Sequence, residues 1–406
     1  MGNSIGTSGP IAMRCNQPAA AVAHYFTSKS WIEGTALEQL GEIAKLPGML
    51  SVASFPDLHP GKYGPVGMAA LASRLYPQLI GNDIGCGMAL FEFDLPQRKF
   101  KLDKAADMLR GLENIRLDVS DVSQTDRSLD LEISTETLGT IGGGNHFCEI
   151  QAVEDLLEED AGQLLDKQKL YLLVHTGSRD LGAKVFNRTI DVSCGLAEGF
   201  DPMSEAGMQW LQLHDLCVEW AKLNRRMIAQ RAAVALRTDC RLIADIPHNL
   251  VRATADGYVH YKGAGAVQDS AIAPIAGSRA SLSYVVEPLA AAAKSHWAIS
   301  HGAGRKYDRR NMHGRTGSTR SEREALLRNP WGGIAICDDR KLAIEEAAGA
   351  YKNAGQVIAD LADHGLIRPL ASMKPLITYK KVSIDHEEPK KDRMRDRRAS
   401  GRHRDV

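Results

Sequence analysis

Four histidines stand where a short apolar run ends in a polar or glycine-rich loop, a place where a rigid scaffold can present side chains to a site. They are His146 in IGGGNHF, His175 in LLVHTGSR, His248 in IADIPHNL and His301 in AISHGAGR. The stretch GNDIGCGM (81–88) adds the carboxylate of Asp83 and the thiol of Cys86 in a loop of the same kind. One such histidine is usually a surface or core residue. The recurrence of the pattern predicts a metal site.

A donor set of carboxylate, thiolate and imidazole suits Mn, Zn, Fe or Co better than Mg or Ca, which prefer oxygen ligands alone. The number of candidate ligands exceeds the four that one ion usually takes, which indicates two metal ions. A thiolate from Cys86 could bridge them, and metal binding would keep it deprotonated. The alternative for Cys86 is a small buried hydrophobic residue.

Several loops have a composition that lets backbone N–H groups approach phosphate. They are GGGNH, HTGSRDLG, AGSR and HGAGR. Neither the P-loop pattern nor the dinucleotide-binding fingerprint occurs in the chain. The loops therefore indicate a nucleotide pocket of another design, although ordinary tight turns would account for one or two of them.

Three segments have the spacing of helices. Residues 35–48 begin with Thr35 and Glu38 in the arrangement of a capping box and end at Pro47, which predicts about three turns. Residues 204–237 carry the longest pattern, a stripe that we expect to face the core. It is formed by Leu213, Leu216, Trp220, Leu223 and Met227. A weaker pattern covers 341–362.

Residues 49–98 and 171–178 have short apolar runs between Gly, Pro and Asp, which predicts strands and tight loops. Helices and strands do not alternate regularly, so a doubly wound parallel sheet is a poor fit. We expect a fold of the α+β class, a single large mixed domain with the candidate site residues in loops at strand ends.

The 406 residues carry 50 basic and 50 acidic side chains, so attraction to a polyanion would depend on local patches. Seven cysteines without a CxxC spacing argue against a disulfide framework or a zinc ribbon and favour a reducing compartment. No apolar run reaches the roughly 18 residues of a membrane helix, and no secretory signal is present at the start. These features predict a cytoplasmic protein.

The ordered motifs of the chain resemble those of the RtcB family of RNA ligases. They are PDLHPGK (56–62), DIGCGM (83–88), LGTIGGGNHF (138–147), HTGSRDLG (175–182), HN (248–249), YKGA (261–264), AGSR (276–279) and SHGAGR (300–305). The resemblance covers about residues 35–380. It implies a GTP- and Mn(II)-dependent enzyme that joins an RNA 3′-phosphate, or a 2′,3′-cyclic phosphate, to a 5′-hydroxyl, in RNA repair or tRNA splicing.

Carried over position by position, the resemblance implies that Cys86 bridges two Mn(II) ions. One ion would also be held by Asp83 and His146, and the other by His175 and His248. His301 would be the nucleophile that attacks GTP and carries GMP, Asp57 would orient His301, and Arg309 would contact RNA phosphate. An imidazole is a competent covalent nucleophile, and two metal ions can orient an in-line displacement.

The resemblance also implies a guanylate pocket. Its residues would be Asn145, His146, Phe147, Cys148, Glu149, His248, Asn249, Ala276, Gly277, Ser278, Arg279, Ser283, His301, Gly302, Ala303, Gly304 and Lys380. The chain departs from the family pattern in AGSR, YKGA and Asp308, at none of the ligand positions. These departures favour a divergent branch devoted to RNA repair.

The domain organisation expected is a ligase domain over residues 1–380 and a charged, unstructured tail over 381–406. Two other functions fit parts of the pattern. A two-metal phosphoesterase would use the same ligands to activate water but would leave His301 without a role. An inactive paralogue that only binds RNA would not require the complete set of ligands.

Overall fold

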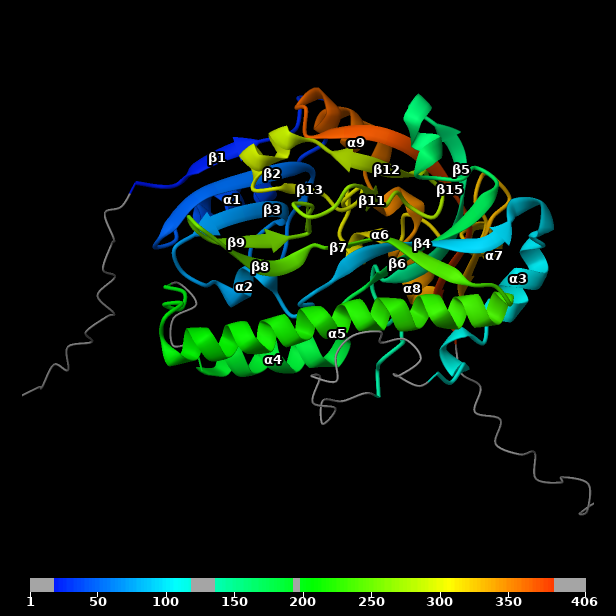
Figure 1. Cartoon of the computed structure of the whole chain (residues 1–406), viewed down its shortest axis with the longest axis horizontal. Coiled ribbons are helices and arrows are strands. Elements are labelled where there is room, and N and C mark those ends of the chain that lie inside the picture. The colour runs from blue at the N-terminus through cyan, green and yellow to red at the C-terminus, as the bar shows by residue number, and fades with distance from the viewer. Residues whose placement is uncertain (1–17, 118–135, 193–197, 383–406) are drawn as a thin grey trace, which may run out of the picture.

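A computed structural model describes residues 18–117, 136–192 and 198–382 of the chain. Two large sheets face each other, and helices cover their outer sides (Figure 1). One sheet has the strand order β1-β2-β3-β9-β8, and the larger has the order β11-β12-β15-β5-β6-β4-β7, with β14 paired to β15. A fold of the α+β class in a single mixed domain was expected from the sequence, and this expectation is confirmed.

The strands of the first sheet are β1 (Ala21–His24), β2 (Met49–His59), β3 (Val66–Ala72), β8 (Asn249–Thr254) and β9 (Gly257–Lys262). Those of the second are β4 (Gly87–Pro96), β5 (Phe147–Leu156), β6 (Lys169–Thr176), β7 (Cys240–Pro247), β11 (Ala273–Ile275), β12 (Ser283–Pro288), β14 (Ile334–Cys337) and β15 (Ile367–Lys381). A short antiparallel pair, β10 (Ala264–Ala266) and β13 (Ala298–Ser300), forms a separate two-stranded sheet and packs in the same core as the two large ones. The strands predicted in 49–98 and 171–178 are confirmed.

The helices are α1 (Gly34–Ile43), α2 (Pro77–Ile80), α3 (Leu102–Leu109), α4 (Arg179–Val192), α5 (Glu205–Leu236), α6 (Arg309–Met312), α7 (Arg320–Ala325), α8 (Arg340–Glu345) and α9 (Ala354–Asp363). The long helix α5 runs beside α4 along one face of the molecule (Figure 1). None of the helices in the part of the chain described here has the length and apolar character needed to cross a membrane.

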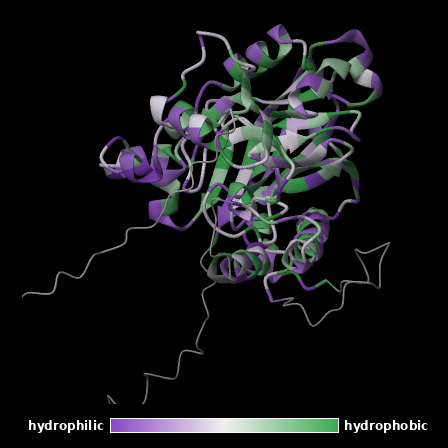
Figure 2. Ribbon diagram, turned by 90° about the vertical axis from the view of Figure 1, so that its left-hand side faces the viewer, coloured by the Kyte–Doolittle hydropathy of each residue, from purple (hydrophilic) through white to green (hydrophobic). Residues whose placement is uncertain are grey.

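The central strands are buried on both faces, which explains their nearly continuous apolar sequence. In β6, Leu170, Leu172 and Val174 pack toward α3 and α5, whereas Tyr171 and Leu173 pack into the core between the two sheets. Figure 2 shows hydrophobic residues concentrated in these inner strands and hydrophilic residues on the outer helices. The buried strands form a rigid base for the loops at their ends.

Two helix predictions need correction. Thr35 does not cap the first helix, because the chain already enters α1 at Glu33 and Thr35 lies within the first turn. The pattern over 341–362 is not one helix but α8, a short 3-10 turn at Ala348–Ala350 and α9. The interruption has a cause, since the backbone N–H of Lys352 bonds to Gly304 and Asn353 caps α9.

The helix predicted at 204–237 is confirmed as α5, and three of the five residues of the predicted stripe, Trp220, Leu223 and Met227, are buried. Leu213 is exposed, whereas His214, Asn224 and Arg225 are buried. These three polar side chains hold other segments in place through hydrogen bonds: His214 accepts from the backbone of Val251, at 2.9 Å. The polar contacts explain why the helix turns these residues inward.

The buried His260 is held in its neutral form. Its Nε2 accepts from the backbone N–H of Tyr76 at 2.9 Å, and its Nδ1 faces the carbonyls of Tyr258 and Ala70. Burial lowers the pKa of His260 to about 4, and the two carbonyls only partly oppose this effect. Because the folded pKa lies below that of the unfolded chain, stability is fully present above about pH 6.5 and falls as the pH drops toward 4.

We therefore expect His260 to contribute about 2 kcal/mol to the loss of unfolding free energy between pH 8 and pH 5. In His260→Gln, which can still accept from Tyr76, this loss should shrink by about that amount, as measured by urea unfolding at the two pH values. His313→Gln, at an exposed position, is the control. An unchanged pH dependence in His260→Gln would contradict the assignment.

Candidate active site

The loops singled out in the sequence meet at one cavity of about 320 Å³. Most of the predicted site residues line it: Asp83, Cys86, Asn145, Phe147, Glu149, His175, His248, Asn249, Ala276, Gly277, Ser278, Arg279, Ser283, His301, Gly302, Ala303, Gly304, Arg309 and Lys380. His146 and Asp57 lie just behind the wall, each hydrogen-bonded to a residue that forms it. Sequence-distant segments thus converge on a single site.

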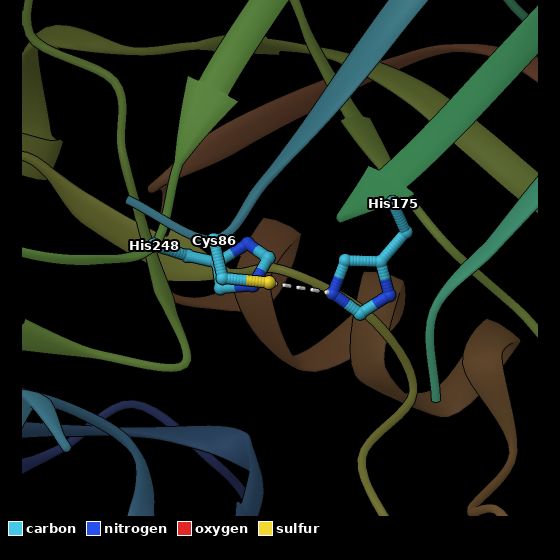
Figure 3. Close-up of side chains that lie close together, drawn as sticks. All are labelled: Cys86, His175 and His248. Carbon is cyan, nitrogen blue, oxygen red and sulfur yellow. Dashed lines mark hydrogen bonds between the residues drawn. The ribbon is translucent and has the colours of Figure 1, made fainter. Parts of the chain in front are cut away.

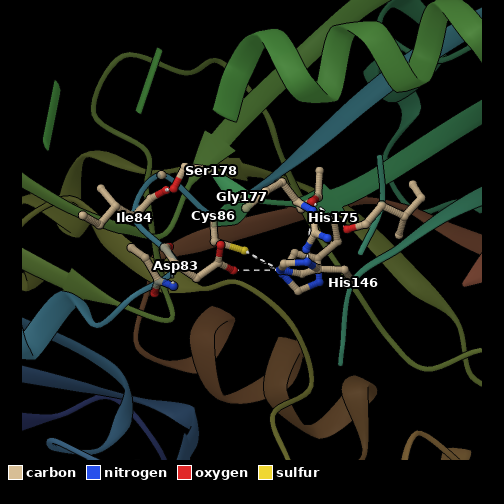
Figure 4. Close-up of polar contacts among 12 residues, drawn as sticks. Asp83, Ile84, Cys86, His146, His175, Gly177 and Ser178 are labelled. Carbon is tan, nitrogen blue, oxygen red and sulfur yellow. Dashed lines mark hydrogen bonds and ion pairs between the residues drawn. The ribbon is translucent and has the colours of Figure 1, made fainter. Parts of the chain in front are cut away.

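Cys86 lies at the centre of a cluster of metal-ligand side chains (Figures 3 and 4). Its Sγ is 3.3 Å from His175 Nε2 and 3.4 Å from His146 Nε2. His146 Nε2 is in turn 2.7 Å from Asp83 Oδ2. Two groups of three donors result, Asp83–Cys86–His146 and Cys86–His175–His248, each with its donor atoms within 4.8 Å of one another. Because the groups share Cys86, the arrangement could hold two ions with one thiolate between them.

The protonation states in the cluster suit metal binding. Burial lowers the pKa of His175 and of His248 well below the ordinary value, which leaves both imidazoles neutral and able to donate a lone pair. Burial, followed by the charge of Asp83, raises the pKa of the Cys86 thiol. A bound divalent cation would offset this by favouring the thiolate.

One nitrogen atom of the cluster is buried without a hydrogen bond within the described part of the chain. Nδ1 of His248 is buried, with no hydrogen-bond partner among the described residues. Buried polar atoms are nearly always paired, so an unpaired imidazole nitrogen within a set of metal donors is suited to bind a cation. Together with the donor chemistry, it supports a metal site here.

The loop that carries Asp83 and Cys86 is held in place by hydrogen bonds from α5. The fully buried Arg225 donates from Nη1 to the carbonyls of Gly85, at 2.9 Å, and Thr176, at 2.8 Å, and from Nε to Asp245, at 2.8 Å. One guanidinium therefore joins the segments that present Cys86, His175 and His248. Gly85 has φ +74, and a Cβ there would come within 2.8 Å of the α5 backbone, so this glycine is required for close packing.

Two further contacts link neighbouring loops. The hydroxyl of Ser178, after β6, donates to the carbonyl of Ile84, at 2.5 Å (Figure 4). Asn224, beside Arg225 on α5, accepts from the backbone N–H of Gly139 at 2.6 Å and donates to the carbonyl of Thr140 at 3.2 Å. The GGGNH loop that ends in His146 is thereby tied to the same helix.

His301 faces the cluster from the opposite wall. Its ring centroid is 4.3 Å from that of His248. Its Nδ1 is 3.0 Å from Asp57 Oδ2 and 2.6 Å from the carbonyl of Gly263, and Ser300 donates to the other carboxylate oxygen of Asp57 at 2.8 Å. Since both partners of Nδ1 are acceptors, Nδ1 carries a proton, and Nε2 has no hydrogen-bond partner among the described residues.

A third group of side chains forms a cationic wall. The buried carboxylate of Glu346 lies 3.1 Å from Arg305, 3.3 Å from Arg309 and 3.5 Å from Lys380, and the hydroxyl of Tyr351 donates to it. Burial alone would favour the protonated acid, but Lys380 and Arg305 lower the pKa of Glu346. One negative charge facing three positive charges leaves this wall attractive to phosphate.

One predicted pocket residue points elsewhere. Cys148 lies on β5 between Phe147 and Glu149, and successive side chains on a strand alternate between faces. Phe147 and Glu149 line the cavity, whereas Cys148 packs into the apolar layer with Ile150 and Val174. Its side chain therefore faces away from the cavity, unlike those of its two neighbours. Burial raises the pKa of Glu149 to about 7.

Several residues that complete the site were not predicted from the sequence. Glu346, Tyr351, Arg305 and Lys262 line the cavity, and Arg225 supports it. A signal for Arg225 was present, namely a charged residue on the otherwise apolar side of a long helix. Glu346 and Tyr351 lie in the segment 341–362, where the spacing of apolar residues resembles that of one continuous helix. Nothing in that pattern indicated that these two residues belong to the site.

The fold and the site define a mixed α/β protein with a buried cluster of metal-ligand side chains and a phosphate-attracting wall in one cavity. A family model described as tRNA-splicing ligase RtcB matches residues 39–132 and 104–381. The chain belongs to the RtcB family.

Curated relatives agree with this membership. RNA-splicing ligase RtcB2 of Escherichia coli is 38% identical over 363 residues, which cover 86% of this chain and 93% of that protein. RNA-splicing ligase RtcB1 of the same organism is 26% identical, over 86% of this chain and 95% of its own. The tRNA-splicing ligase RtcB of Thermococcus kodakarensis is 25% identical, over 84% and 90%.

We expect Arg225→Met to lower the free energy of unfolding by about 3–5 kcal/mol, because it leaves Asp245 buried without its counter-charge. Equilibrium urea unfolding measures this change. Arg226→Met, at the next position of α5 and only half-buried, should cost less than about 1 kcal/mol. Equal losses in the two variants would contradict the role given to Arg225.

Proposed function

We propose that the protein is a GTP-dependent RNA ligase that joins RNA 3′-phosphate or 2′,3′-cyclic phosphate ends to 5′-hydroxyl ends. The observation that carries the proposal is the placement of His301, with Nδ1 turned to Asp57 and Nε2 free beside the donor cluster. A phosphoesterase would need no nucleophilic imidazole there. The relatives are named RNA-splicing or tRNA-splicing ligases, which supports a ligase activity.

Asp83, Cys86, His146, His175 and His248 would hold two metal ions, Mn(II) in this proposal. When bound, these ions would act as Lewis acids that neutralise charge on phosphate oxygens. The surrounding protein supplies the remaining charge through Arg305, Arg309 and Lys380. Arg279 adds a buried guanidinium whose Nη1 has no partner among the described residues, so it remains available to an anion in the cavity.

The guanine base would be recognised by complementary charge. Guanine offers N–H donors on one edge and the O6 acceptor beside them. Glu149, an acceptor, and Lys380, a donor, both line the cavity, and Lys380 is close enough to influence the pKa of Glu149. In this proposal Asn145, Phe147, Asn249, the 276–279 turn, Ser283 and the 302–304 turn form the rest of the nucleotide pocket.

The proposed reaction has three steps. Nε2 of His301 attacks the α-phosphorus of GTP, a P–N bond forms and pyrophosphate leaves. An oxygen of the RNA 3′-phosphate then attacks this phosphorus, the P–N bond breaks and GMP passes to the RNA end. The 5′-hydroxyl attacks the activated 3′-phosphate, loses its proton and releases GMP, and a cyclic phosphate would first be hydrolysed to the 3′-phosphate. The Asp57 carboxylate stabilises the imidazole of His301 when that ring carries positive charge.

The RNA that is repaired or spliced would approach beside Arg309, whose side chain is 45% exposed although its Nε bonds to Glu346. Arg309 can therefore contact an RNA phosphate without leaving the cationic wall. The proposed cytoplasmic location is consistent with the free cysteines of the described residues.

For the metal site, we expect Cys86→Ala to remove the thiolate-to-cobalt charge-transfer band that Co(II) should produce with the wild-type protein, because Cys86 belongs to both donor groups. Absorption spectroscopy during a Co(II) titration measures it. Cys337→Ala removes a buried cysteine outside the cluster and should leave the band intact. A band that persists in Cys86→Ala would contradict the site.

For the nucleophile, we expect GTP labelled at the α-phosphate to transfer an acid-labile label to the protein in the presence of Mn(II). His301→Ala should abolish labelling, and Asp57→Asn should slow it by about 10- to 100-fold because the imidazole loses its orienting carboxylate. His313→Ala is the control. GTP turnover without any protein-bound label would favour the two-metal phosphoesterase, and neither label nor turnover would favour the inactive paralogue.

A further inference from the structure

A second cavity, of about 690 Å³, lies beside the active site. Its walls come from three segments, 31–33, 59–66 and 305–311. Four residues, His59, Val66, Arg305 and Arg309, line both this cavity and the active-site cavity. The two cavities are therefore adjacent, and we call the second one the Trp31 groove.

Trp31 is the large aromatic residue of this groove that is open to solvent. It is 41% exposed, and the ammonium of Lys352 lies 5.9 Å from its ring centroid. Lys352 is itself buried, with Nζ bonded to the carbonyls of Pro56 and Leu58, at 2.9 Å and 2.6 Å. The indole is thus supported on its inner side, and its outer part is available for stacking.

The groove also has cations that can meet phosphates. Lys306 has no carboxylate within ion-pair distance among the described residues, and its ammonium lies 5.4 Å from the ring centroid of Tyr307. Arg309 is half-exposed and shares Glu346 with Arg305 and Lys380.

Two acids, Glu33 and Asp308, line the groove as well. Asp308 is already engaged, because its side chain accepts from the backbone N–H of Arg310 and caps α6. Glu33 precedes α1 as its N-cap residue, and its charge acts on the buried ammonium of Lys352. Both acids of the lining are therefore engaged, and the three cations of the 305–309 segment outnumber them, which favours an anionic ligand.

We propose that the Trp31 groove binds the single-stranded RNA next to the break, with a base stacked on Trp31 and backbone phosphates on Lys306 and Arg309. Aromatic stacking combined with a cationic track is the usual way in which proteins hold unpaired nucleotides. The inference rests on the proposed ligase function and adds a requirement to it. Ends with unpaired nucleotides should be joined well, and ends closed in a duplex up to the break should be joined poorly.

Trp31→Ala, Trp31→Phe and Trp331→Ala test the proposal. Trp331 is 37% exposed and lines neither cavity, which makes it a matched control. Loss of one stacked base costs about 1–3 kcal/mol, so Trp31→Ala should weaken binding of a fluorescein-labelled single-stranded RNA by about 5- to 150-fold in fluorescence anisotropy. Trp31→Phe should retain most of the affinity, and Trp331→Ala should match the wild type.

RNAs with a single abasic position locate the stacked nucleotide. An abasic site at the stacked position should weaken wild-type binding and leave Trp31→Ala unaffected. Moving the abasic site along the strand that bears the 3′-phosphate, and then along the strand that bears the 5′-hydroxyl, identifies the strand in the groove. Lys306→Gln should lower the slope of log affinity against log salt by about 0.7, the value for one phosphate contact on a single strand.

Ligation and guanylylation separate this inference from the proposed function. All Trp31 variants should accept the guanylate label like the wild type, since the groove lies beyond the nucleotide cavity, and Trp31→Ala should ligate single-stranded ends with a raised KM. Equal RNA affinity in Trp31→Ala and Trp331→Ala would overturn the groove assignment. Absence of labelling and ligation in the wild type would overturn the proposed function instead, while the anisotropy measurements would still decide whether the groove binds RNA.

Discussion

The buried guanidinium of Arg225 is the interaction on which the site depends. It sits on the inner side of α5 and donates to Gly85, Thr176 and Asp245, one acceptor in each of the segments that present metal-ligand side chains. A planar group with donors in fixed directions sets the relative positions of its acceptors. The cost of burying its charge is offset by Asp245 and by these carbonyls. The protein itself therefore holds the donor cluster in place.

The central strands contribute side chains to two layers. One is an apolar layer that stabilises the fold, and the other faces the cavity and contains the candidate site residues. Because both faces of β5 and β6 are buried, alternate residues serve different layers. Cys148 joins the apolar packing under α3 and α5, while its neighbour Glu149 enters the cavity. A shift of one residue in register would exchange these roles, so strand pairing and site composition are coupled.

The side of the cavity opposite the donor cluster is formed by segments that lie outside regular helices and strands. Between α8 and α9 the chain leaves helical geometry so that Glu346 and Tyr351 meet the cationic wall and Lys352 reaches the carbonyls on either side of Asp57. Gly304 has φ +71 and passes so close to Asp57 that a Cβ would lie 2.3 Å from its carbonyl oxygen. These departures bring the Asp57 carboxylate within hydrogen-bond distance of His301, and local deviation from pattern is common at functional sites.

The sequence by itself determined the kinds of donor, their place at strand ends, the long helix and the mixed fold, because residue chemistry and hydrophobic periodicity are local properties. It identified Asp83, Cys86 and the histidines as one set, and the resemblance assigned them roles. Only the tertiary structure decided that Arg225 faces inward, that Glu346 gathers three cations, and that Trp31 stands beside the active-site cavity. These facts depend on contacts between segments far apart in the chain, and no spacing along the sequence records them.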